Sequence, residues 1–488
     1  MLNFKKMKYL KYITIAFLIF SVQSCSDFLE QEPGLRTSID ELLQNKQGVL
    51  RALNGIYNEL EANVRGERFA VYADLQGGNI KFSPISSTGQ ITAPLNIREV
   101  YSFEDLAETS NFNLFYGESY DIINQANLIL EYIPSLPDAT ETEKNKIKAE
   151  ALTIRAYTHF LLALVHTQNY SYTSAASHPG IVYNTESIKS GVKYPARKTA
   201  AETYALIIDD LKTALENYSD TSSLAGPSYS FFNKNNTKAL LARVYLYKRD
   251  WVNAYETAND VITNSGFTLV SSSDLAAQWS DPDLPLSETL MEFSISKDSE
   301  GTVSSSMSSN FGYNGSTYAR YTASNDLIDL YENNDIRKQL FVTTPLSTLV
   351  NGVRRDMSYN FTKKYQDNAG YVAFRLSEMY LIRAEAAFEN NRSDLALADI
   401  NIIRARANAS LLTSTANLKE DILLERRKEL CFEGQFFFDL TRNHMGITRN
   451  DGCVSNNCSI TYPSLKFVLP IPLYNTNLNE NLQQNESY

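Results

Sequence analysis

Three glutamates are spaced four residues apart near the C-terminus: Glu425, Glu429 and Glu433. In a helix this spacing places three carboxyl groups on one face. A glycoside hydrolase also uses carboxyl groups, but it holds two of them on opposite sides of a cleft. Basic residues nearby supply counter-charges, namely Arg404, Arg406, Arg426, Arg427 and Arg442. We therefore predict a structural ion-pair network in this segment rather than a catalytic site.

The rest of the sequence has no recognisable catalytic or metal-binding motif. HExxH, GxSxG, Walker and dinucleotide-binding patterns are absent from the 488 residues. His159 and His166 are seven residues apart in one helical pattern, and no Cys accompanies them. The sequence therefore predicts no catalytic residue, no metal site and no cofactor.

Aromatic residues in polar loops are better candidates for a binding site. Sugars stack on aromatic rings while amides and carboxylates bind their hydroxyl groups. The chain has 30 Tyr and 24 Phe but 2 Trp, and both Trp251 and Trp279 fall in helical patterns. A ring platform must therefore consist of Tyr and Phe. The candidates are Phe82, Tyr101 and Tyr116 in one loop, and Phe311, Tyr313, Asn314, Tyr318 and Tyr321 in another.

Helices must position these loops. Apolar residues recur at helical spacing from Thr142 to Thr167, and Thr199 with Glu202 forms a capping-box pattern before another helix. Two further windows have the small-residue spacing of tetratricopeptide hairpins, with turns at 248–250 and 390–393. We predict a mostly α fold, a tetratricopeptide-like superhelix of about four helix pairs. Ordinary helical hairpins of a globular α domain are the alternative.

Long polar segments separate these helices and are predicted to be irregular loops with little β structure. They are residues 66–116, 168–198, 266–325 and 341–370. Loops of this length in a compact chain usually carry function.

The first 25 residues have the pattern of an exported lipoprotein. Four lysines precede an apolar run at 13–20, which is too short to span the ~30 Å hydrocarbon core of a membrane. The residues before Cys25 resemble the lipobox of bacterial lipoproteins. We predict that residues 1–24 are a signal peptide that is removed, and that Cys25 is acylated. Without these four lysines the net charge falls from −11 to −15, which argues against nucleic-acid binding.

The other cysteines suit an exported protein. Cys453 and Cys458 enclose a short polar segment, and we predict a disulfide between them. Cys431 lies next to Phe432 in a helical pattern and is predicted to be a buried thiol.

Over nearly its whole length the chain resembles the SusD/RagB family of Bacteroidetes outer-membrane lipoproteins. The matching segments occur in the family's order: residues 25–33, 120–130, 150–157, 242–247, 374–386, 425–430, 438–442, 469–472 and 481–488. Glu486 and Ser487 replace the Pro and Gly that usually close the family's sequences.

The resemblance implies a protein exposed on the cell surface and anchored to the outer membrane by lipid, including palmitate, on Cys25. Such a protein is a lid over a TonB-dependent transporter barrel of the SusC type. The resemblance also implies that the segment from Glu425 to Arg442, with Arg427 and Asp439, is scaffold. Residues 25–225 and 226–488 would be the family's N-terminal and C-terminal regions, folded as one compact unit.

We therefore expect a binding protein that captures an oligosaccharide and delivers it to the transporter, as in polysaccharide utilisation. Two alternatives stay open. Peptide capture, as in the RagB branch, would also suit a groove lined by Tyr, Asn and Ser. A surface glycoside hydrolase would need two carboxyl groups ~5–10 Å apart across a cleft.

Overall fold

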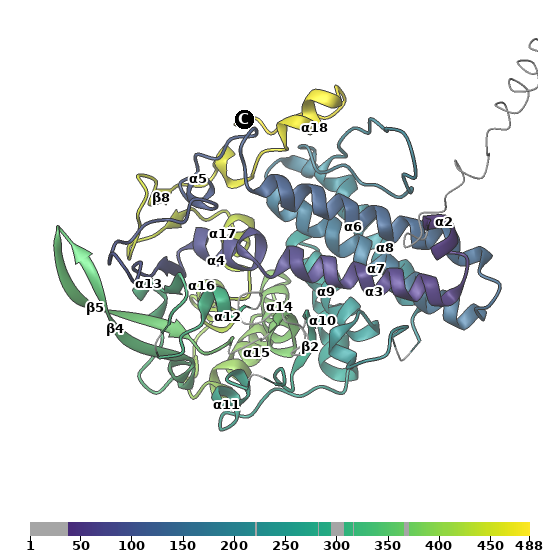
Figure 1. Ribbon diagram of the computed structural model, residues 1–488. Helices are drawn as coiled ribbons and strands as arrows, with labels where there is room; N and C mark the ends of the chain where they lie inside the picture. Colours follow the sequence, from purple (N-terminus) through teal and green to yellow (C-terminus); the bar gives the residue numbers. More distant parts are fainter. Residues whose placement is uncertain (1–37, 220–221, 282, 294–306, 316, 366–369) are drawn as a thin grey trace, which may run out of the picture.

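The computed structural model describes residues 38–219, 222–281, 283–293, 307–315, 317–365 and 370–488 (Figure 1). The predicted signal peptide, residues 1–24, and the predicted lipidation site Cys25 lie outside these ranges. None of the described helices is both long and apolar enough to cross a membrane.

Helices dominate the described chain and confirm the predicted mostly α fold. The long ones are α3 (Lys46–Val64), α6 (Phe112–Tyr132), α7 (Glu141–His166), α8 (Ala200–Asn217), α9 (Lys234–Lys248), α10 (Trp251–Asn264), α14 (Leu376–Glu389), α15 (Ser393–Arg406) and α16 (Leu418–Glu429). Within the described residues α3 packs on α6, α7 on α8, α9 on α10 and α14 on α15, and each pair contacts the next.

Local sequence explains where these helices begin and end. Thr199 caps α8 with Glu202 in a capping box, as predicted, and Thr140 caps α7 in the same way. Between α9 and α10, Arg249 adopts the left-handed conformation (φ 62°) that ends the first helix. Ala254 and Ala258 are fully buried, so these two helices approach each other closely.

The segment 341–370, predicted to be an irregular loop, instead forms a β-hairpin. Strands β4 (Phe341–Val350) and β5 (Val353–Thr362) pair from Phe341 with Thr362 to Val350 with Val353. Asn351 and Gly352 both have positive φ, which is the two-residue turn that matches strand twist. The hairpin extends away from the helices in Figure 1.

The other strands pair segments that are far apart in the sequence. Strands β1 (Ile80–Phe82) and β3 (Tyr321–Ala323) join the hairpin in a sheet of order β1-β3-β5-β4. The pairs β2 (Thr289–Phe293) with β6 (Tyr371–Arg375), and β7 (Ile447–Thr448) with β8 (Ser459–Ile460), are separate. The predicted loops 66–116 and 266–325 therefore contain short ordered elements.

Short helices complete the described chain. They are α2 (Ile39–Leu42), η2 (Glu67–Val71), α4 (Tyr72–Gly77), α5 (Arg98–Tyr101), η3 (Ile133–Ser135), η4 (Ser174–Ala176), η5 (Ser228–Ser230), α11 (Leu275–Trp279), α12 (Ser308–Phe311), α13 (Asn325–Ile328), η7 (Ile336–Leu340), α17 (Phe436–Arg442), η8 (Leu465–Phe467) and α18 (Leu473–Leu478).

One large hydrophobic cluster joins the two halves of the sequence. Tyr157 of α7, for example, lies 5.9 Å from Phe374 of β6, measured between ring centroids. A disulfide links Cys453 to Cys458, and Cys431 is a buried free thiol.

Candidate functional site

The three C-terminal carboxyl groups form a buried ion-pair network. Glu425 binds Arg337 at 2.6 Å, and Glu429 binds Arg337 at 3.0 Å and Arg375 at 2.6 Å. Glu433 binds Arg375 at 2.8 Å and Lys364 at 2.6 Å. Burial by itself would raise the pKa of Glu429, but the surrounding guanidinium groups hold it well below its usual range.

This network differs in detail from the sequence prediction. Helix α16 ends at Glu429, so Glu433 is not on the same helical face; it follows a turn at Phe432, which has a φ of 67°. Within the described chain Arg427 makes no ion pair, but donates to Asn79 and lies over the Phe436 ring. Asp439 and Arg442 pair at 2.7 Å. Arg404 pairs with Glu425 at 2.9 Å and Arg406 pairs with Glu429, as predicted. The further counter-charges Arg337, Lys364 and Arg375 come from segments that sequence reasoning did not connect to this helix.

Most of the aromatic residues predicted to form a platform are in the core. Phe82, Tyr101, Tyr116, Phe311 and Tyr321 are each at most 4% exposed. Phe82 packs between Tyr101, 4.9 Å away, and Tyr321, 5.7 Å away, between ring centroids. Tyr116 alone among them lines one of the two cavities described below, and the other four rings line neither.

Tyr313, Asn314 and Tyr318 lie at the surface, in a turn on the β4–β5 hairpin. Tyr313 and Tyr318 pair across the turn and pack on Phe361, with ring centroids 5.2 and 5.9 Å from it. Asn314 accepts a hydrogen bond from the Thr317 backbone. None of the three lines the cavity beside α3 or the cavity beside residues 182–195, so a binding role for them stays a prediction.

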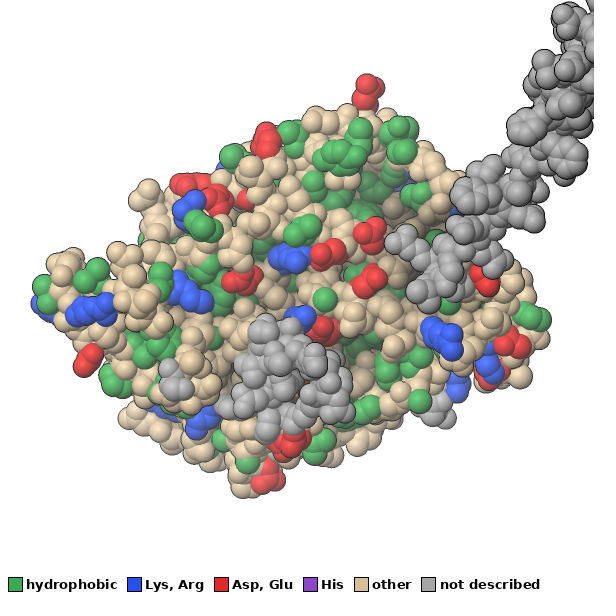
Figure 2. Space-filling model, viewed as in Figure 1, with side chains coloured by type: hydrophobic (Ala, Val, Ile, Leu, Met, Phe, Trp, Pro, Cys, Tyr) green, Lys and Arg blue, Asp and Glu red, His purple; other side chains and the backbone are tan. Residues whose placement is uncertain are grey.

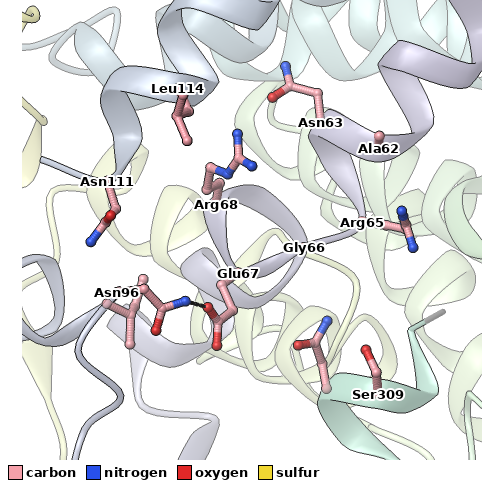
Figure 3. Close-up of a pocket in the computed structure, with 12 residues that line it drawn as sticks. Ala62, Asn63, Arg65, Gly66, Glu67, Arg68, Asn96, Asn111, Leu114 and Ser309 are labelled. Atoms are coloured by element: carbon pink, nitrogen blue, oxygen red, sulfur yellow. Dashed lines mark hydrogen bonds between the residues drawn. The ribbon is translucent and has the colours of Figure 1, made fainter. Parts of the chain in front are cut away.

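A cavity of about 430 Å³ opens between the end of α3 and the start of α6 (Figure 3). We call it the α3–α6 pocket. Its lining is rich in amide and charged side chains and consists of Ala62, Asn63, Arg65, Gly66, Glu67, Arg68, Asn96, Ile97, Asn111, Leu114, Ser309 and Asn310. Most of these residues come from the two predicted loops 66–116 and 266–325.

The backbone around Gly66 creates this pocket. Helix α3 ends at Val64, and Gly66 is extended before the chain enters the π-helix η2. Phe69 and the two residues after it are buried, while Glu67 and Arg68 at the start of η2 stay half-buried and line the cavity. A Cβ atom at Gly66 would meet no atom within 4 Å, so the space in front of it is open.

Each charged group of the pocket is held by one or two neighbours. Glu67 accepts hydrogen bonds from Tyr321 and from Asn96, the latter drawn in Figure 3. Arg68 pairs with Glu118 at 2.7 Å, and Arg65 pairs with Glu61 at 2.8 Å. Burial raises the pKa of Glu61 to about 7, although Arg65 opposes this shift.

One buried polar atom at the pocket has no partner. Asn63 is 1% exposed, and its Nδ2 donates to Ser119 at 2.9 Å. Its Oδ1 accepts no hydrogen bond from the described residues. A buried acceptor of this kind costs free energy until a donor from a ligand or water satisfies it.

Sequence reasoning identified the loops but missed the residues of this pocket. It searched for rings, whereas the lining has amides and guanidinium groups. The signal was the run Arg65-Gly66-Glu67-Arg68, a glycine among charges directly after an amphipathic helix.

Known protein families and individual relatives match most of the chain. A family model described as "Starch-binding associating with outer membrane" matches residues 27–246, and one described as "SusD family" matches residues 348–488. SusD-like protein P38 of Formosa agariphila is 23% identical over 90% of this chain and 93% of its own length. Starch-binding protein SusD of Bacteroides thetaiotaomicron is 36% identical over 24% of this chain and 21% of its own length.

Solved structures share the fold. A putative sugar binding protein from Bacteroides vulgatus is 28% identical, with a TM-score of 0.77 over 91% of this chain and 99% of that chain. A SusD superfamily protein from Bacteroides thetaiotaomicron is 25% identical, with the same TM-score over 90% of this chain and 99% of that one.

Proposed function

This chain belongs to the SusD/RagB family, and we propose that it captures an oligosaccharide in the α3–α6 pocket. Members of the family are binding proteins rather than enzymes. The matched family description and the name of the solved neighbour from Bacteroides vulgatus both point to sugars as the ligand class.

The composition of the pocket carries this proposal. Sugar hydroxyl groups both donate and accept hydrogen bonds, so they need acceptors and donors in one small space. Asn63 Oδ1 is a buried acceptor without a partner, and Arg68 has guanidinium donors beyond the one that binds Glu118. Leu114 adds an exposed apolar surface for the C–H face of a sugar ring.

Binding without hydrolysis fits the carboxyl groups of the pocket. A glycoside hydrolase needs a second carboxyl group facing the first across the cleft. Among the described lining residues Glu67 is the only carboxylate, and Tyr321 and Asn96 already bind it. This arrangement supports capture of the ligand.

Delivery completes the proposed function. The protein is attached to the outer membrane by lipid on Cys25, on the cell surface, and passes its ligand to a TonB-dependent transporter of the SusC type. The family model's description of an outer-membrane association supports this part of the proposal. Two or more acyl chains are needed for stable anchoring of a protein that does not span the bilayer.

Binding measurements on full-length protein in detergent test the ligand class. We would screen a glycan array and an oligopeptide panel with wild type, Gly66→Phe and the matched control Gly55→Phe. Both glycines have open space around a Cβ position, but Gly55 lines neither cavity described here. We expect glycan binding that Gly66→Phe abolishes and Gly55→Phe keeps. Peptide-only binding, or glycan binding unchanged in Gly66→Phe, would contradict the proposal.

A further inference from the structure

A second cavity, of about 420 Å³, lies further along helix α6. We call it the α6–α18 pocket, because α6, residues 182–195 and α18 line it. Figure 2 shows hydrophobic side chains gathered over α18 and the segment beside it. Val192, Tyr194 and Leu478 at this cavity are all more than half exposed, and exposed apolar side chains that gather at a cavity indicate a binding surface.

Hydrogen bonds hold the segments that line this second cavity together. Asn124 of α6 accepts from the Ile188 backbone at 2.7 Å, and Tyr120 donates to the Val182 carbonyl at 2.9 Å. From the other side, Asn479 donates to the Pro195 carbonyl at 2.8 Å. The segment 182–195 is thus bound to both α6 and the C-terminal tail, so the cavity is formed before any ligand arrives.

Several polar side chains in this cavity have no bonding partner among the described residues. The side chains of Asp121, Asn184 and Asn475 make no hydrogen bond or ion pair with the described residues. With the ring of Tyr194 they supply one carboxylate, two amides and one aromatic surface. This is the set of groups that binds sugar hydroxyls and sugar ring faces.

The two cavities lie along one stripe of α6. Asn111, Leu114, Glu118 and Asp121 follow at intervals of three or four residues, so they share one helix face. Leu114 lines the first cavity and Asp121 the second, and they are about 10 Å apart along the helix axis. Glu118 lies between them and holds Arg68 of the first cavity.

Gly117 leaves the passage between the cavities open. It is exposed, lines the second cavity, and lies one turn beyond Leu114. A Cβ atom there would meet no atom within 4 Å. Any side chain at this position would rise between the two cavities, but glycine has none.

We infer that the α3–α6 and α6–α18 pockets are two ends of one glycan-binding groove over Gly117, so that the ligand is an extended oligosaccharide. This inference rests on the proposed function for the first pocket. A single sugar unit fits within one pocket, whereas a longer chain crosses the exposed face of α6 and makes contacts in both.

Affinity as a function of ligand length tests the groove. The probes are ladders of malto-, cello-, xylo-, manno- and laminari-oligosaccharides, each from the monosaccharide to the hexasaccharide, titrated against full-length protein in detergent. We expect the affinity of wild type to rise by about tenfold or more from the shortest ligand that binds to the hexasaccharide. Gly117→Phe should remove this gain, so that affinity no longer rises with the length of the ligand. Asp121→Ala should remove part of it.

The controls separate this inference from the proposed function. Gly55→Phe, also in a helix with open space, should behave as wild type at every length. Circular dichroism checks that each variant is folded. Length-independent affinity in wild type, or equal losses for short and long ligands in Gly117→Phe, would overturn the groove and leave the first pocket intact. No binding to any ladder would overturn both.

Discussion

Arginine and glutamate occur in two settings in this protein, and their surroundings give them different tasks. In the network around α16, Arg375 binds Glu288, Glu429 and Glu433 and is essentially unexposed. In the α3–α6 pocket, Arg68 has a single carboxylate partner and its side chain is 31% exposed. The comparison teaches that the number of partners and the degree of burial, rather than residue type, separate scaffold from a binding surface.

Removal of one arginine from each region should give the largest contrast. Arg375→Met leaves buried carboxylates without their shared partner, so we expect a loss of about 3–5 kcal/mol in the free energy of unfolding. Arg68→Met breaks a half-exposed pair, and we expect a loss of about 1 kcal/mol or less. Urea unfolding of the two variants measures both. Similar losses in the two would contradict the assignment of separate tasks.

Buried carboxyl groups whose pKa is raised by burial should differ from paired ones in the pH dependence of stability. Glu150 is buried and accepts a hydrogen bond from Tyr57 at 2.8 Å; burial raises its pKa to about 7, although Lys146 opposes this shift. In the folded state the Glu150 carboxyl keeps its proton above the unfolded pKa of 4.5. The stabilisation of the fold by this bound proton is therefore complete below pH 4.5 and is lost as the pH rises through 7. Glu150→Gln should therefore reduce the stability decline between pH 4.5 and 7 by about 2–3 kcal/mol.

A buried carboxyl with cationic partners has the opposite sign and supplies the control: Glu385 pairs with Arg442 at 2.7 Å and with Lys419 at 3.0 Å. Burial would raise the pKa of Glu385, but Arg442 and Lys419 hold it well below its usual range. Its stabilising contribution is complete above the unfolded pKa of 4.5 and is lost as pH falls further. The free energy of unfolding of Glu385→Gln should differ from that of wild type in its pH dependence only below about pH 4.5. A changed slope between pH 5 and about 7 would show that the two classes of carboxyl are not distinct.

The helical scaffold was predictable from sequence because its signals are local. Capping boxes and small residues at tetratricopeptide spacing lie within one helix or hairpin. The β4–β5 hairpin was missed, although Asn351-Gly352 is a strong turn signal between strands of alternating character. Composition alone had suggested a loop.

The site was less predictable because burial depends on distant segments. Phe82 looks like a loop aromatic until β3, which is more than 200 residues further along, pairs with β1 and covers it. Arg337 and Arg375 likewise reach α16 only through the tertiary fold. Asn63 sits in a helix and gives no sequence signal that one of its atoms lacks a partner.

A pocket residue should affect binding more than stability. Arg68→Met removes donors from the α3–α6 pocket, and we expect about tenfold weaker glycan binding, or about 1.4 kcal/mol. Isothermal titration at matched protein stability measures this change. Arg98→Met is the control, because Arg98 is exposed, pairs with Glu99 and lines neither cavity. Equal effects of the two substitutions would argue against a specific role for Arg68.

The smallest effect is expected at the surface turn on the hairpin. Tyr313→Ala and Tyr318→Ala remove contacts with Phe361, which costs about 0.5–1.5 kcal/mol of stability each. Neither residue lines the α3–α6 pocket, so glycan affinity should stay within about twofold of wild type. A large loss of affinity in these variants would move the binding site to the turn.

A crystal structure of the protein with the tightest-binding oligosaccharide of the array would locate the binding site. We expect a sugar hydroxyl group within hydrogen-bond distance of Asn63 Oδ1 and a second contact to Arg68, in front of Gly66. An oligosaccharide bound elsewhere, for example at Tyr313 and Tyr318, with the α3–α6 pocket empty, would contradict the account.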